Sequence, residues 1–184
     1  DLLAKGVDFL FLPSVVTREG LAPGQENNTH CPFIQAVPHL VAAALSLDER
    51  SVRVLRGPVY LDDLRSLHRS LQELVEPLGV KANQVKKAAR AAKDAQRSFS
   101  TAMQHMGEKV LSNLDAWERV AVLVGRSYNT CDAGLSAALP YKLRKMGVTP
   151  LPMDCLPLSQ VDVSDRFDNM YWQSGQKILA AARL

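Results

Sequence analysis

The sequence predicts an α/β fold in which two small lobes, each built on a parallel β-sheet, are separated by a helical hairpin. Short apolar, β-branched runs alternate with helical periodicity towards both ends of the chain. Loops rich in turn formers follow the predicted strands, and the middle of the chain shows helical periodicity alone. We therefore expect a first lobe over residues 1–60, the hairpin over residues 61–115 and a second lobe over residues 116–184.

The first lobe is predicted to be a β-loop-α-β unit. Its elements are a strand over residues 7–12, a loop over 14–30, a helix over 32–47 and a strand over 52–55. Pro13-Ser14 is expected to end the first strand and Gly57-Pro58 to close the second. Pro32 suits the first turn of a helix because its missing N–H would have no helical partner there. A bend is expected at Pro38.

The helical hairpin is predicted from two apolar series. The first helix begins near Asp62 and Asp63 and ends at Pro77 and Gly79; its apolar positions are Leu64, Leu67, Leu71, Leu74, Val75 and Leu78. The second helix, over residues 83–113, carries a seven-residue series of Val85, Ala92, Phe99 and Met106, with Met103 and Val110 on the same face. We interpret Met103 and Met106 as core residues.

A basic stripe lies on the second hairpin helix. It consists of Lys86, Arg90, Lys93 and Arg97. Such a stripe is usually a solvated face, although it could instead meet an acidic partner domain or the phosphates of a coenzyme.

The second lobe repeats the order of strand, loop and helix. The predicted elements are a strand over residues 119–124, a loop over 125–132, a helix over 133–146, a strand over 148–153, a loop over 154–165 and a helix over 167–184. Both lobes are expected to be Rossmann- or flavodoxin-like, with ligand loops at the carboxyl ends of the parallel strands. The loops that begin at Pro13, Gly125 and Asp154 should face the same way within their lobes.

The composition excludes several classes of protein. The 184 residues are 47% apolar and 22% charged, with a net charge of +3, so neither disorder nor binding to nucleic acid or anionic lipid is indicated. No apolar run is long enough to span a membrane. Three widely spaced cysteines favour a reducing, cytoplasmic compartment over a disulfide framework. The chain opens at Asp1 without a signal peptide, and we expect it to be an N-terminally truncated part of a longer protein.

Cys31 is the strongest single candidate for a metal-binding residue. It precedes a predicted helix whose exposed N–H groups would favour the thiolate, the form that binds iron or zinc. The alternative is a small buried residue, which is the commoner role of a cysteine without a C-x-x-C partner. We interpret His30 as a loop residue, since the histidines show no ligand spacing. Cys131 and Cys155 could approach a shared crevice with Cys31, but we favour packing roles for both.

A second candidate site is the loop that follows the first strand of the second lobe. Its proposed cofactor-binding residues are Gly125, Arg126, Tyr128 and Asn129. The glycine allows close approach of the backbone, and the guanidinium can meet a phosphate or carboxylate. Neither G-x-G-x-x-G nor a phosphate-loop motif occurs, and an equally weighted alternative is a turn in which Asn129 and Asp132 cap the following helix. Hydrolase motifs are absent as well.

These segments together resemble one protein family. They are Gly6 to Ser14, Cys31-Pro32-Phe33-Ile34-Gln35, Gly125-Arg126-Ser127-Tyr128-Asn129, Pro152-Met153-Asp154, Leu156-Pro157-Leu158, Met170-Tyr171-Trp172 and Gly175-Gln176. The family is the uncharacterised domain of CoA-substrate-specific enzyme activases. It is related to the D-component of 2-hydroxyacyl-CoA dehydratases such as 2-hydroxyglutaryl-CoA dehydratase.

The resemblance implies a part of a cytoplasmic iron-sulfur protein in which ATP-binding activase domains, in the same or another chain, pass electrons to a [4Fe-4S] cluster. It implies that Cys31 is a cluster ligand, with a companion cysteine upstream of Asp1, and that the protein acts on or beside a CoA-ester substrate. The family loop usually reads Gly-Arg-Pro-Tyr-Asn, so Ser127 departs from it, as do Cys131 and Cys155. The fragment alone is expected to be inactive, and its cluster labile or absent.

Two other classes compete with this hypothesis. The first is a non-catalytic α/β module that docks other domains or holds a small ligand, with Cys31 buried and inert. The second is a thiol-based redox enzyme, which requires Cys31 to ionise readily and to react fast.

Overall fold

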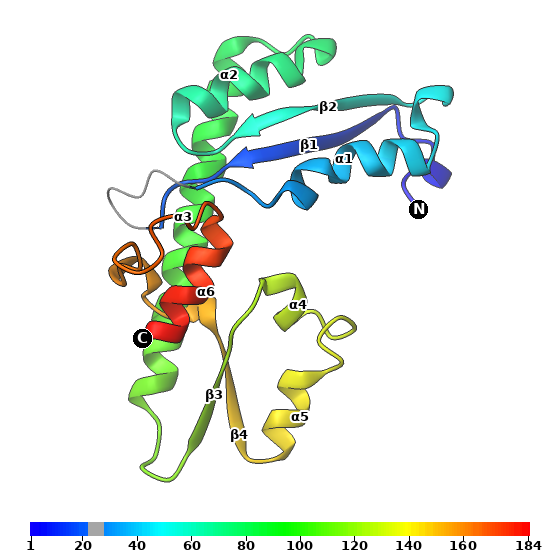
Figure 1. Cartoon of the computed structure of the whole chain (residues 1–184). Helices are drawn as coiled ribbons and strands as arrows, with labels where there is room; N and C mark the ends of the chain where they lie inside the picture. Colours follow the sequence, from blue (N-terminus) through cyan, green and yellow to red (C-terminus); the bar gives the residue numbers. More distant parts are fainter. Residues whose placement is uncertain (22–27) are drawn as a thin grey trace. The chain divides into compact units, whose positions relative to one another are not determined.

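The computed structural model describes residues 1–21 and 28–184, and it confirms the α/β fold class (Figure 1). Two parallel two-stranded sheets are present in this part of the chain, β1 with β2 and β3 with β4. The chain divides into two compact units. The first holds residues 1–20 and 28–93 of the described chain, and the second holds Leu21 and residues 94–184. The long helix α3 (Ala82–Ser112) contributes its first part to one unit and the rest to the other.

The first unit is a β-loop-α-β arrangement followed by helices. Its elements are β1 (Phe9–Thr17), α1 (Pro32–Ala44), β2 (Arg53–Tyr60), α2 (Leu64–Leu74) and the start of α3. Alternate residues of a strand face opposite sides of a sheet, so the strands serve two cores. Leu10 packs with Ala42 and Leu47 on the α1 side. Leu55 and Val59 pack with residues of α2 and α3 on the other side.

Both strands of this unit are longer than predicted. β1 continues through Pro13-Ser14 to Thr17, and β2 continues through Gly57-Pro58 to Tyr60, so these dipeptides do not end the strands. Pro13 pairs with Gly57 and Ser14 with Pro58. In a two-stranded sheet each strand is an edge strand, where proline is tolerated because its missing N–H can face away from the partner. Only the position in the sheet makes these prolines compatible with a strand.

Asp63 fixes the start of α2. Its Oδ1 accepts hydrogen bonds from the backbone N–H groups of Arg65 at 2.6 Å and Ser66 at 2.9 Å, and the Ser66 hydroxyl donates to its Oδ2 at 2.8 Å. These bonds satisfy helix N–H groups that have no partner within the helix. They also hold the pKa of the Asp63 carboxyl below its ordinary value of 3.8, with the bond from the Ser66 backbone as the largest cause.

We therefore expect Asp63→Ala to destabilise the first unit in a pH-dependent way. Because the pKa is lowered by folding, the stabilisation is present above the ordinary pKa and is lost as pH falls through the folded-state value. Urea unfolding should be monitored by far-ultraviolet circular dichroism between about pH 7 and about pH 2. The difference in the free energy of unfolding between wild type and variant should become smaller as the pH falls. Asp63→Asn, which keeps the acceptor oxygen but not the charge, is the matched control. A difference in the free energy of unfolding that stays constant across this pH range would contradict the capping role of the Asp63 carboxylate.

The helix α3 matches its predicted limits within one residue, but its buried residues do not follow the predicted seven-residue series. Val85 is buried, whereas Ala92, Phe99 and Met106 are exposed, so the core role assigned to Met106 is wrong. In the first unit Ala89 is buried instead. In the second unit Met103 and Val110 pack against the core. An apolar residue on a long helix is buried only where another element covers it.

The second unit contains the other sheet. Its elements besides the end of α3 are β3 (Arg119–Leu123), α4 (Ser127–Cys131), α5 (Leu139–Lys145), β4 (Val148–Pro152) and α6 (Gln173–Arg183). The core joins the end of β4 and the segment after it to α6, through residues that include Leu151, Met153, Leu158, Val163 and Ala180. β3 and β4 match their predicted ranges closely.

Three predicted elements of this unit differ from the structure. Residues 127–131 form the short helix α4 rather than a loop, and the helix predicted over residues 133–146 is reduced to α5. Ala137 and Ala138 have positive φ angles of 50° and 55°, and Pro140 lies in the first turn of α5, so no continuous helix passes through them. α6 begins at Gln173 rather than Phe167, because a turn closed by the Met170 N–H and the Phe167 carbonyl precedes it.

Candidate functional site

The backbone before Cys31 is attached to the carboxyl end of β1. Thr17 and Thr29 form an isolated antiparallel bridge. The His30 N–H donates to the Val16 carbonyl at 2.8 Å, and the Arg18 N–H donates to the Asn28 carbonyl at 3.0 Å. Cys31 therefore lies near the carboxyl end of a parallel strand, the end at which open α/β sheets usually bind ligands.

Cys31 is the N-cap residue of α1. Its backbone is extended, with φ −54° and ψ 137°, and Pro32 occupies the first turn of the helix as predicted. The Cys31 carbonyl accepts hydrogen bonds from the N–H groups of Ile34 at 2.9 Å and Gln35 at 3.2 Å. The residue is half-buried rather than sealed in the core. A thiolate at this place would lie beside the positive end of the helix dipole.

Two polar side chains fix the first turn of α1 in place. The Ser14 hydroxyl, which is buried on β1, donates to the Gln35 carbonyl at 2.7 Å, and the Gln35 Nε2 donates to the His30 carbonyl at 2.7 Å. The Thr17 hydroxyl donates to Asp62 Oδ1 at 3.0 Å, which joins the carboxyl ends of β1 and β2. No pattern in the sequence indicates these positioning roles. Gln35 stood in the family motif, but its bonds depend on β1 extending past Pro13.

The cysteines lie in different parts of the chain. Cys31 belongs to the first unit, and Cys131 and Cys155 belong to the second. Cys155 is buried, as its predicted packing role requires, whereas Cys131 is exposed and its predicted packing role is wrong. Within residues 1–21 and 28–184, no group of three or more His, Cys, Asp or Glu side chains could hold a metal ion. These residues do not provide the three or four protein ligands that a [4Fe-4S] cluster normally needs.

The loop that follows β3 forms the start of α4. Arg126 is the N-cap residue of this short helix, and its Nη1 donates to the Tyr128 hydroxyl at 3.0 Å. The Tyr128 side chain is half-exposed, and Asn129 is exposed. A Cβ on Gly125 would lie 3.0 Å from the Thr130 Cγ2, so the loop leaves little room for a side chain there. The predicted capping of a following helix by Asn129 and Asp132 is wrong: α5 begins only at Leu139, and its N-cap residue is Ala138. The Asp132 Oδ1 instead closes a turn, where it accepts from the N–H groups of Gly134 and Leu135, both at 2.9 Å.

A partly buried ion pair lies at the carboxyl end of β4. The Lys177 Nζ of α6 is 3.2 Å from Asp154 Oδ1, and both side chains are about three-quarters buried, with exposed fractions of 27% and 29%. Cys155 is next to this pair. Burial is the main cause that raises the pKa of its thiol, and electrostatic interactions with Asp154 and with the Cys131 side chain add to the effect. The Cys155 thiol is therefore kept protonated, which is unfavourable for a nucleophile or a metal ligand.

The Asp154–Lys177 pair brings together two segments that the sequence marks only as separate motifs. Asp154 ends the Pro152-Met153-Asp154 motif, and Lys177 follows Gly175-Gln176. Lys177 itself could not be predicted, because nothing in the sequence indicates which carboxylate faces α6.

Two residues of the basic stripe of α3 form ion pairs. Lys93 lies 2.5 Å from Glu19, and Arg97 lies 3.7 Å from Asp94.

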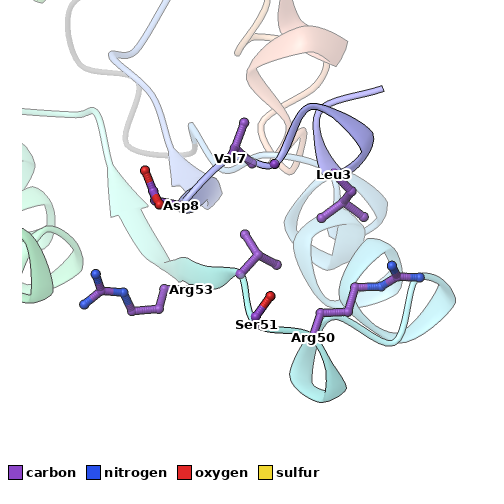
Figure 2. A pocket seen from close by; sticks show the side chains of 8 residues that line it. Leu3, Val7, Asp8, Arg50, Ser51 and Arg53 are labelled. Atoms are coloured by element: carbon purple, nitrogen blue, oxygen red, sulfur yellow. The ribbon is translucent and has the colours of Figure 1, made fainter.

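A cavity of about 530 Å³ lies at the opposite, amino ends of β1 and β2 (Figure 2). It is lined by Leu3, Gly6, Val7, Asp8, Arg50, Ser51, Val52 and Arg53. The two arginine side chains point away from each other in Figure 2. Arg50 Nε donates to the Leu45 carbonyl at 2.8 Å, and the Arg53 guanidinium lies 4.2 Å from the centre of the Phe9 ring. The two guanidinium groups therefore do not converge on a ligand in this cavity.

Comparison with known families identifies the chain. The family model described as CoA enzyme activase uncharacterised domain (DUF2229) matches residues 1–156. The chain belongs to this family. The match includes the Cys31-Pro32 segment, the Gly125 to Asn129 loop and the Asp154 motif of this CoA enzyme activase domain, and it confirms the resemblance seen in the sequence. Searches of curated proteins and of solved structures gave no match.

A helix that crosses a membrane must be both long and apolar. Among the residues that the structure describes, no helix combines the necessary length with sufficient apolar character. Even α3, with 31 residues, carries charged side chains along its length.

Proposed function

We propose that this CoA enzyme activase domain is part of a dehydratase-like iron-sulfur protein that serves ATP-driven electron transfer in CoA-ester metabolism. In this proposal Cys31 contributes one thiolate ligand to a [4Fe-4S] cluster. The observation that carries the proposal is the position of Cys31 as a half-buried N-cap residue of α1, near the carboxyl end of β1. The Ser14–Gln35–His30 hydrogen bonds support it because they fix the turn that carries the sulfur.

The remaining ligands of the proposed cluster must come from outside the described residues. Those residues contain no complete metal-binding group, and a single thiolate does not hold a cluster. When bound, the cluster would supply one-electron redox chemistry. The contribution of this chain is to place one sulfur at the start of α1, beside the positive end of the helix dipole.

The proposed partners follow from the family. They are ATP-binding activase domains, in the same or another chain, and a CoA-ester substrate in the cytoplasm. Arg126 supports a role of the loop after β3 in coenzyme binding, because a guanidinium pairs well with phosphate. The hydrogen bond from Arg126 to the Tyr128 hydroxyl holds these two side chains together at the start of α4. Gly125 and Asn129 complete this proposed coenzyme contact.

Replacing Cys31 tests the proposed ligand. The intact protein that carries this domain should be reconstituted anaerobically with iron and sulfide, as wild type and as Cys31→Ala and Cys131→Ala. We expect Cys31→Ala to lose bound iron and the broad visible absorbance of a cluster, because a ligand is removed. Cys131→Ala is the matched control and should keep both, since Cys131 is an exposed thiol of the second unit.

Circular dichroism should show that both variants remain folded. Unchanged iron content in a folded Cys31→Ala protein would contradict the ligand assignment. The result would then favour the second candidate function, a non-catalytic docking module.

The docking module is favoured by the surface of α1. The helix contains no Asp, Glu, Lys or Arg, and three of its large apolar side chains are exposed, Phe33 by 79%, Val37 by 48% and Leu40 by 59%. Residues at this spacing share one side of a helix, and an apolar helix side is normally covered. If docking is the function, Phe33→Ser should weaken binding to the activase domains while Cys31→Ala leaves that binding unchanged.

A further inference from the structure

A second hollow lies in the second unit, between α6 and the loop before it. Its volume is about 440 Å³, and it is lined by Val163, Arg166, Phe167, Leu179, Ala182 and Arg183. Val163 is 1% exposed and belongs to the core of the unit, against which Leu179 also packs. The Phe167 side chain is 43% exposed. The hollow is therefore an apolar recess within the size range of small-molecule sites.

The walls of this hollow are held by bonds between the loop and α6. The Arg183 guanidinium donates to the Asp162 carbonyl at 2.9 Å and forms an ion pair with Asp165. The N–H groups of Phe167 and Arg166 donate to the Val163 carbonyl at 3.0 Å and 3.3 Å. The loop does not need to rearrange to form the recess.

The charged side chains at the rim of the hollow differ in whether they already have a direct partner. Asp165 is paired with Arg183, which holds the pKa of its carboxyl below the ordinary value. Asp162 accepts a hydrogen bond from the Ser164 N–H at 2.9 Å, and this bond similarly lowers its pKa. Among the described residues, no carboxylate lies within ion-pair distance of the exposed Arg166 guanidinium. Arg166 is thus a rim cation without a direct ion pair, next to an apolar recess, although its charge also helps to lower the pKa of the Asp165 carboxyl.

We propose that this hollow binds the aliphatic tail of a single-chain amphiphile whose anionic head group pairs with Arg166. Val163, Phe167 and Leu179 contact the tail, because these side chains supply the apolar lining. A guanidinium at the rim selects carboxylate or phosphate over neutral and cationic head groups. The site belongs to the second unit, and the proposal does not depend on the function proposed for Cys31.

Binding of sodium octanoate to the full chain, followed by methyl NMR, tests this site. We expect octanoate to shift the methyl signals of Val163 and Leu179. Along the series hexanoate, octanoate and decanoate, each buried methylene should tighten binding about fourfold. Octylamine should bind more weakly than octanoate. Absence of shifts at these methyl groups, affinity independent of chain length, or equal binding of octylamine would each overturn the proposal.

Two substitutions test the tail contact and the head-group contact separately. Ala182→Trp should fill the hollow and weaken octanoate binding by about tenfold or more, whereas Ala92→Trp, at an exposed position of α3, is the matched control. Arg166→Gln should abolish the preference for octanoate over 1-octanol and leave the binding of 1-octanol unchanged. Arg144→Gln, at an exposed position of α5, controls for the loss of one positive charge. Unchanged octanoate binding in Ala182→Trp would overturn the proposal.

Discussion

Replacing Gly107 by alanine should lower the free energy of unfolding of the second unit by about 3 kcal/mol, as overpacking of a tight contact does. Gly107 lies on the buried side of α3. A Cβ added there would overlap the carbonyl oxygen of Cys155 and lie 2.9 Å from the Cys155 carbonyl carbon. Because backbone atoms form this contact, only a shift of α3 or of the segment after β4 can relieve it. Elsewhere in a helix the same substitution stabilises by about 1 kcal/mol.

Urea unfolding followed by the fluorescence of Trp172, which lies in the second unit, should measure this loss. Gly175→Ala in α6 is the matched control. The atoms that its Cβ would meet belong to the flexible side chain of Met170, which can move. A Gly107→Ala protein as stable as wild type would show that α3 does not approach Cys155 as closely as the structure indicates.

The second large effect is expected from Leu55→Ala in the first unit. Leu55 is 4% exposed and packs in the core that contains Val59, Leu67, Leu74 and Ala89. Loss of its side chain leaves a cavity, and the free energy of unfolding should fall by about 3 kcal/mol. Hydrogen exchange of the β1 and β2 amides, or far-ultraviolet circular dichroism in urea, should detect the change, since both tryptophans lie in the second unit.

Phe11→Ala is the matched control for Leu55→Ala. Phe11 pairs with Leu55 in the register of the two strands, but its side chain is 50% exposed. Although phenylalanine is the larger residue, its removal should cost about 1 kcal/mol, because much of its surface is already in contact with water. A loss from Phe11→Ala that equals the loss from Leu55→Ala would contradict the burial of these two residues.

The helices were predictable from the sequence where local chemistry determines their ends. Pro32 marks the start of α1, Asp63 caps α2, and α3 lies within one residue of its predicted limits. In each case the determining groups are within a few residues of the helix end, so their effect can be read without knowing the fold. The same holds for the position of Cys31 as an N-cap residue.

The candidate sites were only partly predictable. Cys31, Arg126 and Tyr128 were found because they stand in recognisable motifs, whereas the contacts that hold them were not. Ser14 reaches Gln35 across 21 positions, and Lys177 reaches Asp154 across 23. Partners so far apart in the chain meet only after folding, and many other polar residues have the same local sequence character.

The sequence by itself determined the α/β class, the parallel pairing expected of its strands, the long helix and the family of the chain. Each depends on periodicity, on a cap or on a contiguous motif. The tertiary structure decided that the strands continue through Pro13 and Pro58, that Phe99 and Met106 stay exposed, and that Gly107 touches Cys155. The physical reason is that burial, sheet position and close approach depend on which distant element lies alongside a residue.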